Sequence, residues 1–518
     1  MTQDTAKRIQ RASLLMVLSI FLSRILGFLR EWVLARTVGA SEMADVYLAS
    51  FTIPDFLNYL MAAGALNISL IPILASYTGE GKDEQGKRVY QTLSTVLSSG
   101  MLVLVLVCQL FAGTLASWVA PGFSPEQHEV LTDLMRLILP AQFFFFWGGM
   151  ANGVQQTHGV FTYSAIAPLL YNLSIVLIGV FLYPLLGVSS FSVGVLVGAF
   201  IGYGLFQIVG LIKLGYPIIP KLHWDLESRT AFKKYLWMSV PIMLAFSLVV
   251  ADEWISKYLA SFMKVGAVSR LSYARTEMRI PIAIIGQAAG IASYPHLSRL
   301  WAKRDFAEFG NTFTRELQKI WALGPIAAVL TFTHALPITD FIYGGGKLTP
   351  EDLRETAELL QLMGLGVVFW IFHILLSRGF YATQTTWLPS LWGTLTTLLF
   401  IPVYVKLSQV WGVHGLALSG TLGIAFYVAT LSWMLGRHLK KNQTSISFKP
   451  LWKFGFQWSL VICILGAISF GLSKLGIYHS TRLSALVDVT VALGVLTSIA
   501  LLLLRKVFAK STPGGALF

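Results

Sequence analysis

The sequence predicts an all-α, polytopic membrane protein of about fourteen transmembrane helices. Of its 518 residues, 55% are hydrophobic and only 12% are charged. The mean hydropathy of +0.67 lies far above that of soluble domains. Apolar stretches of about 20 residues, the length of a helical span, recur along the whole chain. The short alternating segments typical of an outer-membrane barrel do not occur in the sequence.

Turn residues and charge clusters separate the apolar runs and so mark each helix in order. The helices are expected at residues 12–36, 44–77, 87–119, 128–156, 160–185, 189–214, 231–262, 267–298, 312–343, 352–382, 386–407, 412–436, 450–475 and 483–507. Several of these runs exceed a minimal span, so tilted or projecting helices are expected. The basic N-terminus resembles a signal peptide. Because Arg24 interrupts the apolar run and no small-residue cleavage site follows, the first helix is expected to be retained.

Basic residues cluster in alternate connections between these helices and at both termini. They are Lys7, Arg8, Arg11, Lys82, Lys87, Arg88, Lys213, Lys221, Arg229, Lys233, Lys234, Arg299, Lys303, Arg304, Arg315, Lys319, Arg437, Lys440, Lys441, Lys449, Lys453, Arg505, Lys506 and Lys510. By the positive-inside rule both termini face the cytoplasm, which requires an even number of spans. The net charge of +14 therefore reflects cytoplasmic loops. No basic stripe with interleaved aromatic residues indicates a nucleic-acid partner.

An internal repeat relates the second and eighth predicted helices. The second contains Ile53-Pro54 followed by IPIL, and the eighth contains Ile280-Pro281 followed by YPHL. Six predicted helices separate the two copies, so both cross the membrane in the same direction. This pattern predicts two parallel six-helix lobes, at 1–220 and 221–442, followed by two extra helices and a basic tail at 443–518. Such an architecture is associated with alternating-access transporters.

The first helix carries charged residues at bilayer depth. A charged side chain there costs roughly 3 kcal/mol or more, so such residues are candidates for function. Arg24 and Arg30 lie about 120° apart around the helix, with Gly27 between them. Two guanidinium groups on one broad face predict a cavity that binds an anion such as phosphate. The alternative is that Arg24 pairs with Glu31 or Asp45 and that Arg30 reaches the membrane interface.

The second helix carries two carboxylates close to its first proline. Asp45 and Asp55 flank the segment that ends at Pro54. We expect these two carboxylates, together with Glu31 of the first helix, to be counter-ions that orient the arginines before a ligand binds. The alternative for Asp45 is a helix N-cap.

The eighth helix carries Arg275, Glu277 and Arg279 just before Pro281. The two arginines are four residues apart and share a face. We expect them to contribute a second positive group to the substrate site, with Glu277 as a supporting counter-ion. Gly27, Pro54 and Pro281 are expected to be hinge or packing residues.

Asp252 in the seventh helix is a candidate for binding a coupling cation or proton, although Asp252 and Lys257 could instead neutralise one another. No metal-spaced His/Cys cluster, phosphate-binding glycine loop or large extramembrane domain occurs in the sequence, so an enzyme is the weaker class. No cofactor is expected, and Na⁺, H⁺ or the membrane potential are the open energy sources. Cys108 and Cys463 lie inside apolar runs and are expected to be packing residues.

Five sequence blocks carry a family resemblance. They are SRILGFLRE at 23–31, ADVYLASFTIPDFLNYLMAAGALNISLIPILASY at 44–77, APLLYNLSIV at 167–176, GAVSRLSYARTEMRIP at 266–281 and SRGFYATQTTWLP at 377–389. They resemble the MurJ/MviN family of lipid II flippases, of the multidrug/oligosaccharidyl-lipid/polysaccharide exporter superfamily. The resemblance implies a bacterial inner-membrane protein that moves undecaprenyl-pyrophosphate-linked peptidoglycan precursor from the cytoplasmic to the periplasmic leaflet. It implies a role in cell-wall biogenesis and cell shape.

The resemblance also implies roles for particular residues. The family's first-helix arginines fall on Arg24 and Arg30, and its second-helix aspartate falls on Asp45. The final two helices, 450–507, would form a groove for the lipid tail. The expected partners are the lipid-linked pyrophosphate saccharide, membrane lipids and the cell-wall synthesis machinery, and the expected state is a monomer.

The chain departs from the family pattern in two places. Its IPDFLNY stretch lacks the basic residues that usually follow IPN in the family, and its eighth helix reads YARTEMRIP where the family has YADRLxxxP. These differences leave a Wzx-type flippase for another polyprenyl-pyrophosphate-linked saccharide as an alternative. A cation-coupled drug exporter is a weaker alternative, because it would need an acidic cavity and this chain places arginines there.

Overall fold

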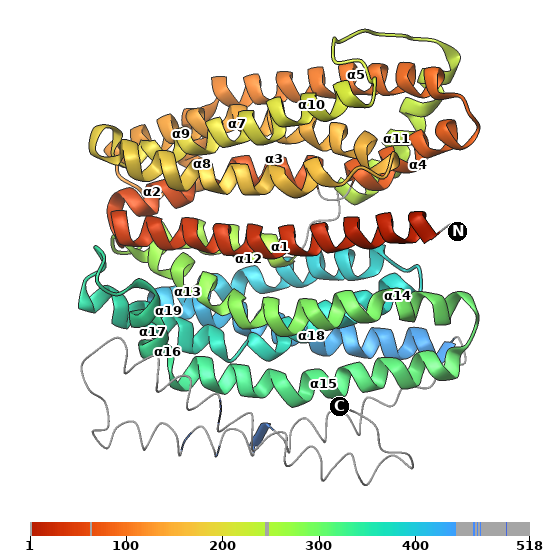
Figure 1. Cartoon of the computed structure of the whole chain (residues 1–518). Coiled ribbons are helices and arrows are strands. Elements are labelled where there is room, and N and C mark those ends of the chain that lie inside the picture. Colours follow the sequence, from red (N-terminus) through yellow and green to blue (C-terminus); the bar gives the residue numbers. More distant parts are fainter. Residues whose placement is uncertain are drawn as a thin grey trace. The chain divides into compact units, whose positions relative to one another are not determined.

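The computed structural model describes residues 3–62, 65–243 and 248–441, with isolated positions at 459, 460, 464, 467 and 494. Helices make up nearly all of these residues, and the described ranges contain no strand (Figure 1). The predicted all-α class is therefore confirmed. The predicted lipid-tail groove at 450–507 lies outside the described ranges.

The chain divides into two compact units. Unit 1 comprises Met1–Ala245 and Lys264–Val268, and unit 2 comprises Phe246–Met263 and Ser269–Phe518. Unit 1 extends beyond the predicted boundary at 220 because α11 (Leu226–Met243) packs on α4 (Ala65–Gly79) and α5 (Asp83–Leu110). The Ser239 hydroxyl of α11 donates to the Ser69 hydroxyl of α4 at 2.9 Å.

Unit 1 contains the elements from α1 to α11 and one π-helical segment, η1. Besides α4, α5 and α11, these are α1 (Gln3–Val38), α2 (Glu42–Ser50), α3 (Thr52–Ala62), α6 (Ala112–Val119), α7 (Pro125–Thr157), α8 (Thr162–Leu186), α9 (Ser189–Ala199), η1 (Phe200–Leu205) and α10 (Phe206–Lys213). The prediction of one continuous helix over 44–77 is wrong, because α2, α3 and α4 share this stretch. Pro54 lies in the first turn of α3, where its missing N–H breaks no helical hydrogen bond.

Unit 2 contains α12 (Leu248–Ala260) and most of α13 (Ala267–Pro281), then η2 (Ile282–Gln287), α14 (Ala288–Ala302), α15 (Phe306–Thr333), α16 (Ala335–Tyr343), α17 (Pro350–Gly364), α18 (Val367–Ala382) and α19 (Trp387–Lys441). The helix predicted at 267–298 is present as α13, η2 and α14, which follow one another without a break, and the π segment η2 begins directly after Pro281. Two other continuous helices predicted here are wrong, because those at 312–343 and 352–382 bend by 74° and 47°. Gly412, at φ 57°, divides α19 between the two helices predicted there.

Several helices are long and apolar enough to cross a membrane. In the described ranges these are α5, α7, α8, the continuous α9–η1–α10 and α19, which makes five, or up to seven when the bent pairs α15–α16 and α17–α18 each count as one span. The chain is therefore a polytopic membrane protein. The count of about fourteen spans, and the cytoplasmic placement of the termini, stay predictions.

A row of glycines sets the spacing between α8 and the α9–η1 segment. Gly194, Gly198 and Gly202 recur every four residues, and a Cβ on each would lie 2.7 to 2.8 Å from a backbone atom of α8. Small residues at this spacing allow helix backbones to approach closely in membrane proteins. The close approach brings Tyr171 of α8 edge-on to Tyr203 of η1, with ring centroids 6.3 Å apart.

Gly198→Ala is expected to destabilise unit 1 by about 1–3 kcal/mol, because the new methyl group would overlap the Tyr171 carbonyl oxygen. Gly100→Ala is the matched control, since nothing lies within 4 Å of a Cβ at that helical position. The control should be neutral or slightly stabilising. Thermal unfolding of the purified protein in detergent measures both variants, and equal midpoints for the two would contradict the tight seam.

Candidate functional site

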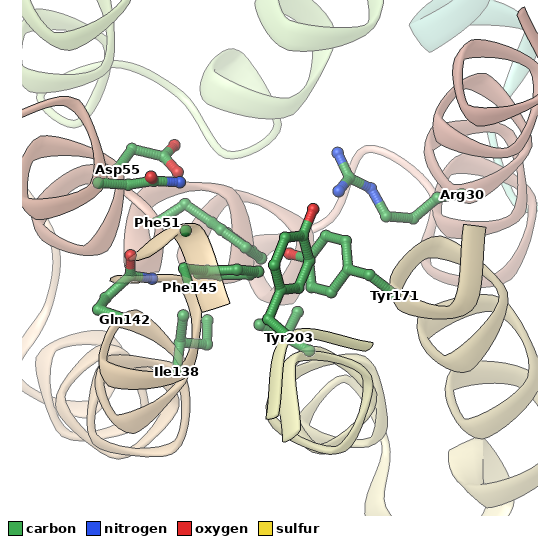
Figure 2. Close-up of a pocket in the computed structure, with 11 residues that line it drawn as sticks. Arg30, Phe51, Asp55, Ile138, Gln142, Phe145, Tyr171 and Tyr203 are labelled. Atoms are coloured by element: carbon green, nitrogen blue, oxygen red, sulfur yellow. The ribbon is translucent and has the colours of Figure 1, made fainter. Parts of the chain in front are cut away.

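A polar cavity of about 410 Å³ lies inside unit 1 (Figure 2). Residues of α1, α3, α7, α8, α9, η1 and the junction between α2 and α3 line it. They are Arg30, Phe51, Asp55, Asn58, Ile138, Gln142, Phe145, Gly149, Tyr171, Val195 and Tyr203. A volume of this size is typical of sites that enclose a small molecule or one part of a larger one.

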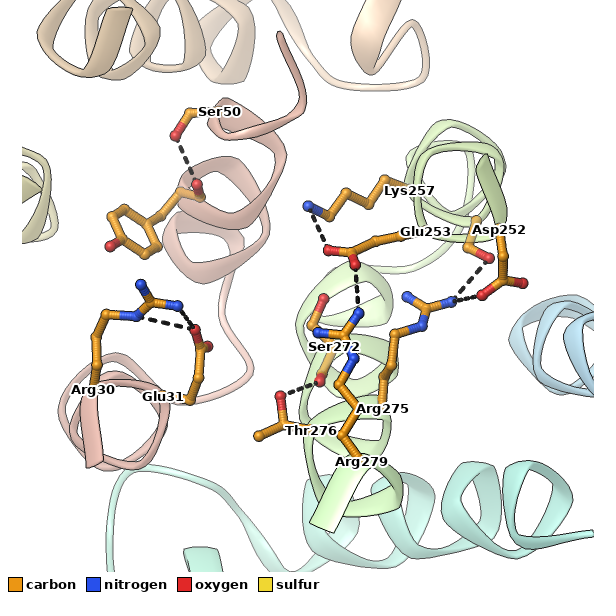
Figure 3. Close-up of polar contacts among 12 residues, drawn as sticks. Arg30, Glu31, Ser50, Asp252, Glu253, Lys257, Ser272, Arg275, Thr276 and Arg279 are labelled. Atoms are coloured by element: carbon orange, nitrogen blue, oxygen red, sulfur yellow. Dashed lines mark hydrogen bonds and ion pairs between the residues drawn. The ribbon is translucent and has the colours of Figure 1, made fainter. Parts of the chain in front are cut away.

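Arg30 supplies the positive charge of this cavity, and Glu31 holds it in place. The Arg30 Nη2 and Nε atoms donate to Glu31 Oε1 at 2.6 and 3.2 Å (Figure 3). The Arg30 side chain remains 27% exposed. A guanidinium carries more N–H donors than this one oxygen uses, so the group can bind a further acceptor such as a phosphate oxygen.

The other walls combine hydrogen-bonding groups with aromatic rings. Asp55 and Gln142 lie across the cavity from Arg30 (Figure 2). Gln142 is buried, and its Oε1 atom has no hydrogen-bond partner within the described part of the chain. Phe145 contacts the rings of Tyr171 and Tyr203 edge-on, with centroids 5.1 and 4.8 Å apart. The cavity therefore offers polar contacts and apolar ring faces together.

Local backbone features place Tyr203 in the wall. Tyr203 lies in η1, and π segments within α-helices are frequent at functional sites. On the facing helix, a Cβ at Gly148 would lie 2.4 Å from the Tyr203 carbonyl oxygen, so α7 can approach η1 only because this residue is glycine. Sequence analysis missed Gln142, Tyr171 and Tyr203. The glycines of α7 and α9 could have indicated these residues, because glycines mark the places where neighbouring helices approach closely.

Arg24 does not line this cavity. Its side chain is exposed on α1, beside exposed Phe21 and Ile25. Glu31, its expected alternative partner, bonds to Arg30. A Cβ at Gly27 would meet Asn172 Oδ1 of α8 at 3.9 Å, an ordinary contact, so the packing there does not require glycine. The substrate-binding role of Arg24 stays a prediction.

Asp45 is buried near the N-terminus of α2. The N-cap of this helix is Ser41, whose side chain accepts from the Ala44 N–H, so the N-cap alternative for Asp45 is wrong. The Asp45 Oδ2 atom instead accepts the backbone N–H of Gly266 at 2.7 Å. Gly266 has a φ of +86° and belongs to the 264–268 segment of unit 1.

Asp252 of unit 2 binds Arg275 (Figure 3). The Arg275 Nη2 atom donates to Asp252 Oδ2 at 2.9 Å and to Ser256 Oγ at 3.2 Å, and the Tyr404 hydroxyl donates to Asp252 Oδ1. Arg275 is buried, and the cavity beside the pair has a volume of only about 10 Å³. Mutual neutralisation of Asp252 and Lys257 is therefore wrong in this structure.

Arg279 is the more accessible of the two arginines on α13. Its Nη2 atom donates to Glu253 Oε2 at 2.8 Å, while its side chain remains 55% exposed. Lys257 bonds to the other oxygen of Glu253 at 3.2 Å. Both arginines thus lie on the side of α13 that faces α12, as their spacing predicts. The described residues contain no group of three or more His, Cys, Asp and Glu that could hold a metal.

Glu277 lies on another side of α13. It is about 200° around the helix from Arg275, and the Thr339 hydroxyl of α16 donates to its Oε2 atom at 2.8 Å. The structure therefore does not pair Glu277 with an arginine. Sequence analysis also missed buried Arg270, which bonds Asp352 at 2.7 Å and Glu355 at 3.0 Å on α17.

Comparisons with known proteins agree on one family. The family model described as lipid II flippase MurJ matches residues 34–487. A lipid II flippase MurJ of Burkholderia cenocepacia is 30% identical over 427 residues, covering 80% of this chain and 81% of that protein. A probable lipid II flippase MurJ of Vibrio cholerae is 25% identical over 520 residues, covering 98% of each.

Solved structures show the same fold. A lipid II flippase MurJ in an inward closed conformation superimposes with a TM-score of 0.79 at 20% identity, covering 96% of this chain and 100% of that chain. An inward-facing multidrug resistance MATE family transporter superimposes with a TM-score of 0.67 at 14% identity, covering 83% of this chain and 100% of that chain. Because the family model spans most of the sequence, the chain belongs to the lipid II flippase MurJ family.

Proposed function

We propose that this chain moves lipid II, the undecaprenyl-pyrophosphate-linked peptidoglycan precursor, from the cytoplasmic to the periplasmic leaflet of the bacterial inner membrane. Family membership supports this substrate. A diphosphate and its saccharide cannot cross hydrocarbon unaided, because charged and polar groups lose their hydration there. A polyprenyl tail never needs to leave the hydrocarbon. The protein therefore has to shelter only the headgroup.

The observation that carries the proposal is the Arg30 guanidinium facing a polar cavity of about 410 Å³. Phosphate oxygens would take the place of Glu31 Oε1 or bind beside it, because arginine binds carboxylate and phosphate with the same planar geometry. Gln142 Oε1 is an acceptor available to a sugar hydroxyl. The cavity encloses only part of the headgroup, so the remainder would extend beyond it.

The transport cycle we propose is alternating access by a monomer with both termini in the cytoplasm. The two-lobe sequence repeat supports alternating access, and the basic connections support the orientation. Association with the cell-wall synthesis machinery would place the exported precursor next to the enzymes that use it.

The ion pair between Asp252 and Arg275 argues against a coupling cation bound to the Asp252 carboxylate. We propose that Asp252 is a positioning residue for Arg275. A sodium ion at Asp252 would have to displace a guanidinium that also bonds Ser256. H⁺ or the membrane potential is the energy source that this arrangement favours.

Arg30→Ala is expected to lower lipid II transport by about tenfold or more, since a lost charge-assisted contact is worth at least about 1.4 kcal/mol. Arg30→Lys should recover part of the activity, because lysine keeps the charge but not the planar fork. Rescue of a MurJ-depleted cell, with membrane insertion measured in parallel, tests both. Arg36→Ala is the matched control, since Arg36 lies over the Trp32 ring and does not line the cavity.

Normal rescue by Arg30→Ala would contradict the proposed role of the cavity. Arg24→Ala is tested in the same cells and is expected to abolish transport, with partial recovery in Arg24→Lys. If the unaltered chain is well inserted but fails to rescue, lipid II is not its substrate. The Wzx-type alternative would then be tested with another polyprenyl-pyrophosphate saccharide.

Asp252→Asn is expected to destabilise the protein by about 3–5 kcal/mol, because it leaves the buried Arg275 guanidinium without its counter-ion. The double variant Asp252→Asn, Arg275→Met should regain most of this loss, since no buried charge then remains unpaired. Thermal unfolding of both variants in detergent measures the difference. Equal destabilisation of the single and double variants would show that Asp252 has a role other than holding Arg275.

A further inference from the structure

Glu277 is a buried carboxyl group in unit 2 that the proposed transport site does not use. Only 3% of the residue is exposed. The Thr339 hydroxyl donates to Oε2 at 2.8 Å, and Oε1 has no hydrogen-bond partner among the residues that the structure describes. The described neighbour that bonds Glu277 is thus an uncharged hydroxyl group.

The charges near Glu277 on its own helix are directed elsewhere. Arg275 and Arg279 bond Asp252 and Glu253 on α12 (Figure 3). Arg270, two turns before Glu277, bonds carboxylates on α17. Tyr273, one turn before Glu277, contacts Tyr343 of α16 in a tilted arrangement, with ring centroids 5.3 Å apart.

The titratable groups on the neighbouring helices are also engaged with other residues. On α12, Lys257 bonds Glu253. On α17, Asp352 and Glu355 bond Arg270. On α16, Asp340 is an acidic residue that follows Thr339 in sequence, and the Tyr343 hydroxyl donates to the Tyr273 carbonyl oxygen at 3.5 Å.

An ionised carboxylate in this place would have neither a cation nor a second donor to stabilise it. Burial without such partners strongly disfavours the charged form of a carboxyl group, whereas the protonated form is neutral. Asp252 and Glu253, each bonded to a cation, are in the opposite situation. Glu277 is therefore the described carboxyl group of this bundle best suited to carry a proton.

We propose that Glu277 and Thr339 form a proton-binding site that takes up one proton from water on one side of the membrane and releases it to water on the other in each transport cycle. The role in transport rests on the proposed flippase function. Release requires water to reach the carboxyl group. Thr339 lies on α16, a short helix that follows a 74° bend, so displacement of this one element would open the site.

Infrared spectroscopy of the full-length protein in lipid nanodiscs tests proton binding without transport. At neutral pH the wild type should show the carbonyl band of a protonated carboxyl group, shifted in D₂O, and Glu277→Gln should lack that band. Glu351→Gln is the matched control, because Glu351 is an exposed carboxyl group on α17. Identical spectra for the wild type and Glu277→Gln would overturn the proposal.

Thr339→Val provides a second variant in case Glu277→Gln does not fold. Loss of the hydroxyl donor should shift the Glu277 carbonyl band, and an unmoved band would overturn the site. If Glu277 carries the proton next to Thr339, removal of the Thr339 hydroxyl must change the position of the Glu277 carbonyl band. A contact that is merely structural would not require this change.

Transport by the full chain in proteoliposomes, with fluorescent lipid II as the probe, tests coupling. An imposed gradient of one pH unit should change the steady-state distribution of lipid II by up to about tenfold, the factor that one proton can supply. Glu277→Gln should transport without responding to the gradient, whereas Glu351→Gln should respond like the wild type. A response that survives in Glu277→Gln would overturn the coupling role. A wild-type protein that shows the infrared band but moves no lipid II would support the proton site and contradict the proposed flippase function.

Discussion

A charged side chain inside a membrane protein needs an opposite charge or a water-filled cavity beside it. The hydrocarbon of the bilayer contains no water that could hydrate the charge. This constraint organises unit 2 around α13. Arg275 and Arg279 bond carboxylates on α12, and Arg270 bonds carboxylates on α17. The hydrophobic effect does not drive association between helices in lipid, so polar bonds such as these help to fix the position and rotation of α13. A change in any of them would change the relation between α12, α13 and α17.

The arginine of the unit 1 cavity obeys the same constraint in a different way. Arg30 bonds Glu31, its neighbour on α1, and not a carboxylate on another helix. Helix packing in unit 1 depends instead on close backbone approach at Gly148, Gly194, Gly198 and Gly202. An entering anion can therefore replace Glu31 without breaking a contact between helices. The same exchange at Arg275 would separate α13 from α12, which is why Arg30 is the better anion-binding group.

Composition and hydropathy predict the helical membrane class, and the four-residue spacing of Arg275 and Arg279 predicts their shared face. The 74° bend after Thr333 could not be predicted, because the helices on its two sides are together long and apolar enough to read as one span. Asp252 and Glu277 could not be told apart, because both are acids in apolar helices and only the fold decides which of them meets an arginine. Tyr171 and Tyr203 are ordinary aromatic residues until the glycine row brings α8 and η1 together.

The fold by itself does not decide what is transported. A multidrug resistance transporter of the MATE family superimposes on this chain with a TM-score of 0.67 at 14% identity, which shows a common architecture and nothing about cargo. The distinction lies in the sites. A cationic drug needs an acidic wall, whereas the unit 1 cavity sets Arg30 opposite Asp55 and adds an unpartnered amide oxygen at Gln142. A site with both signs of charge and neutral acceptors suits a ligand that joins a diphosphate to sugar hydroxyls. That match links the cavity to the chemistry of the family's lipid-linked substrate.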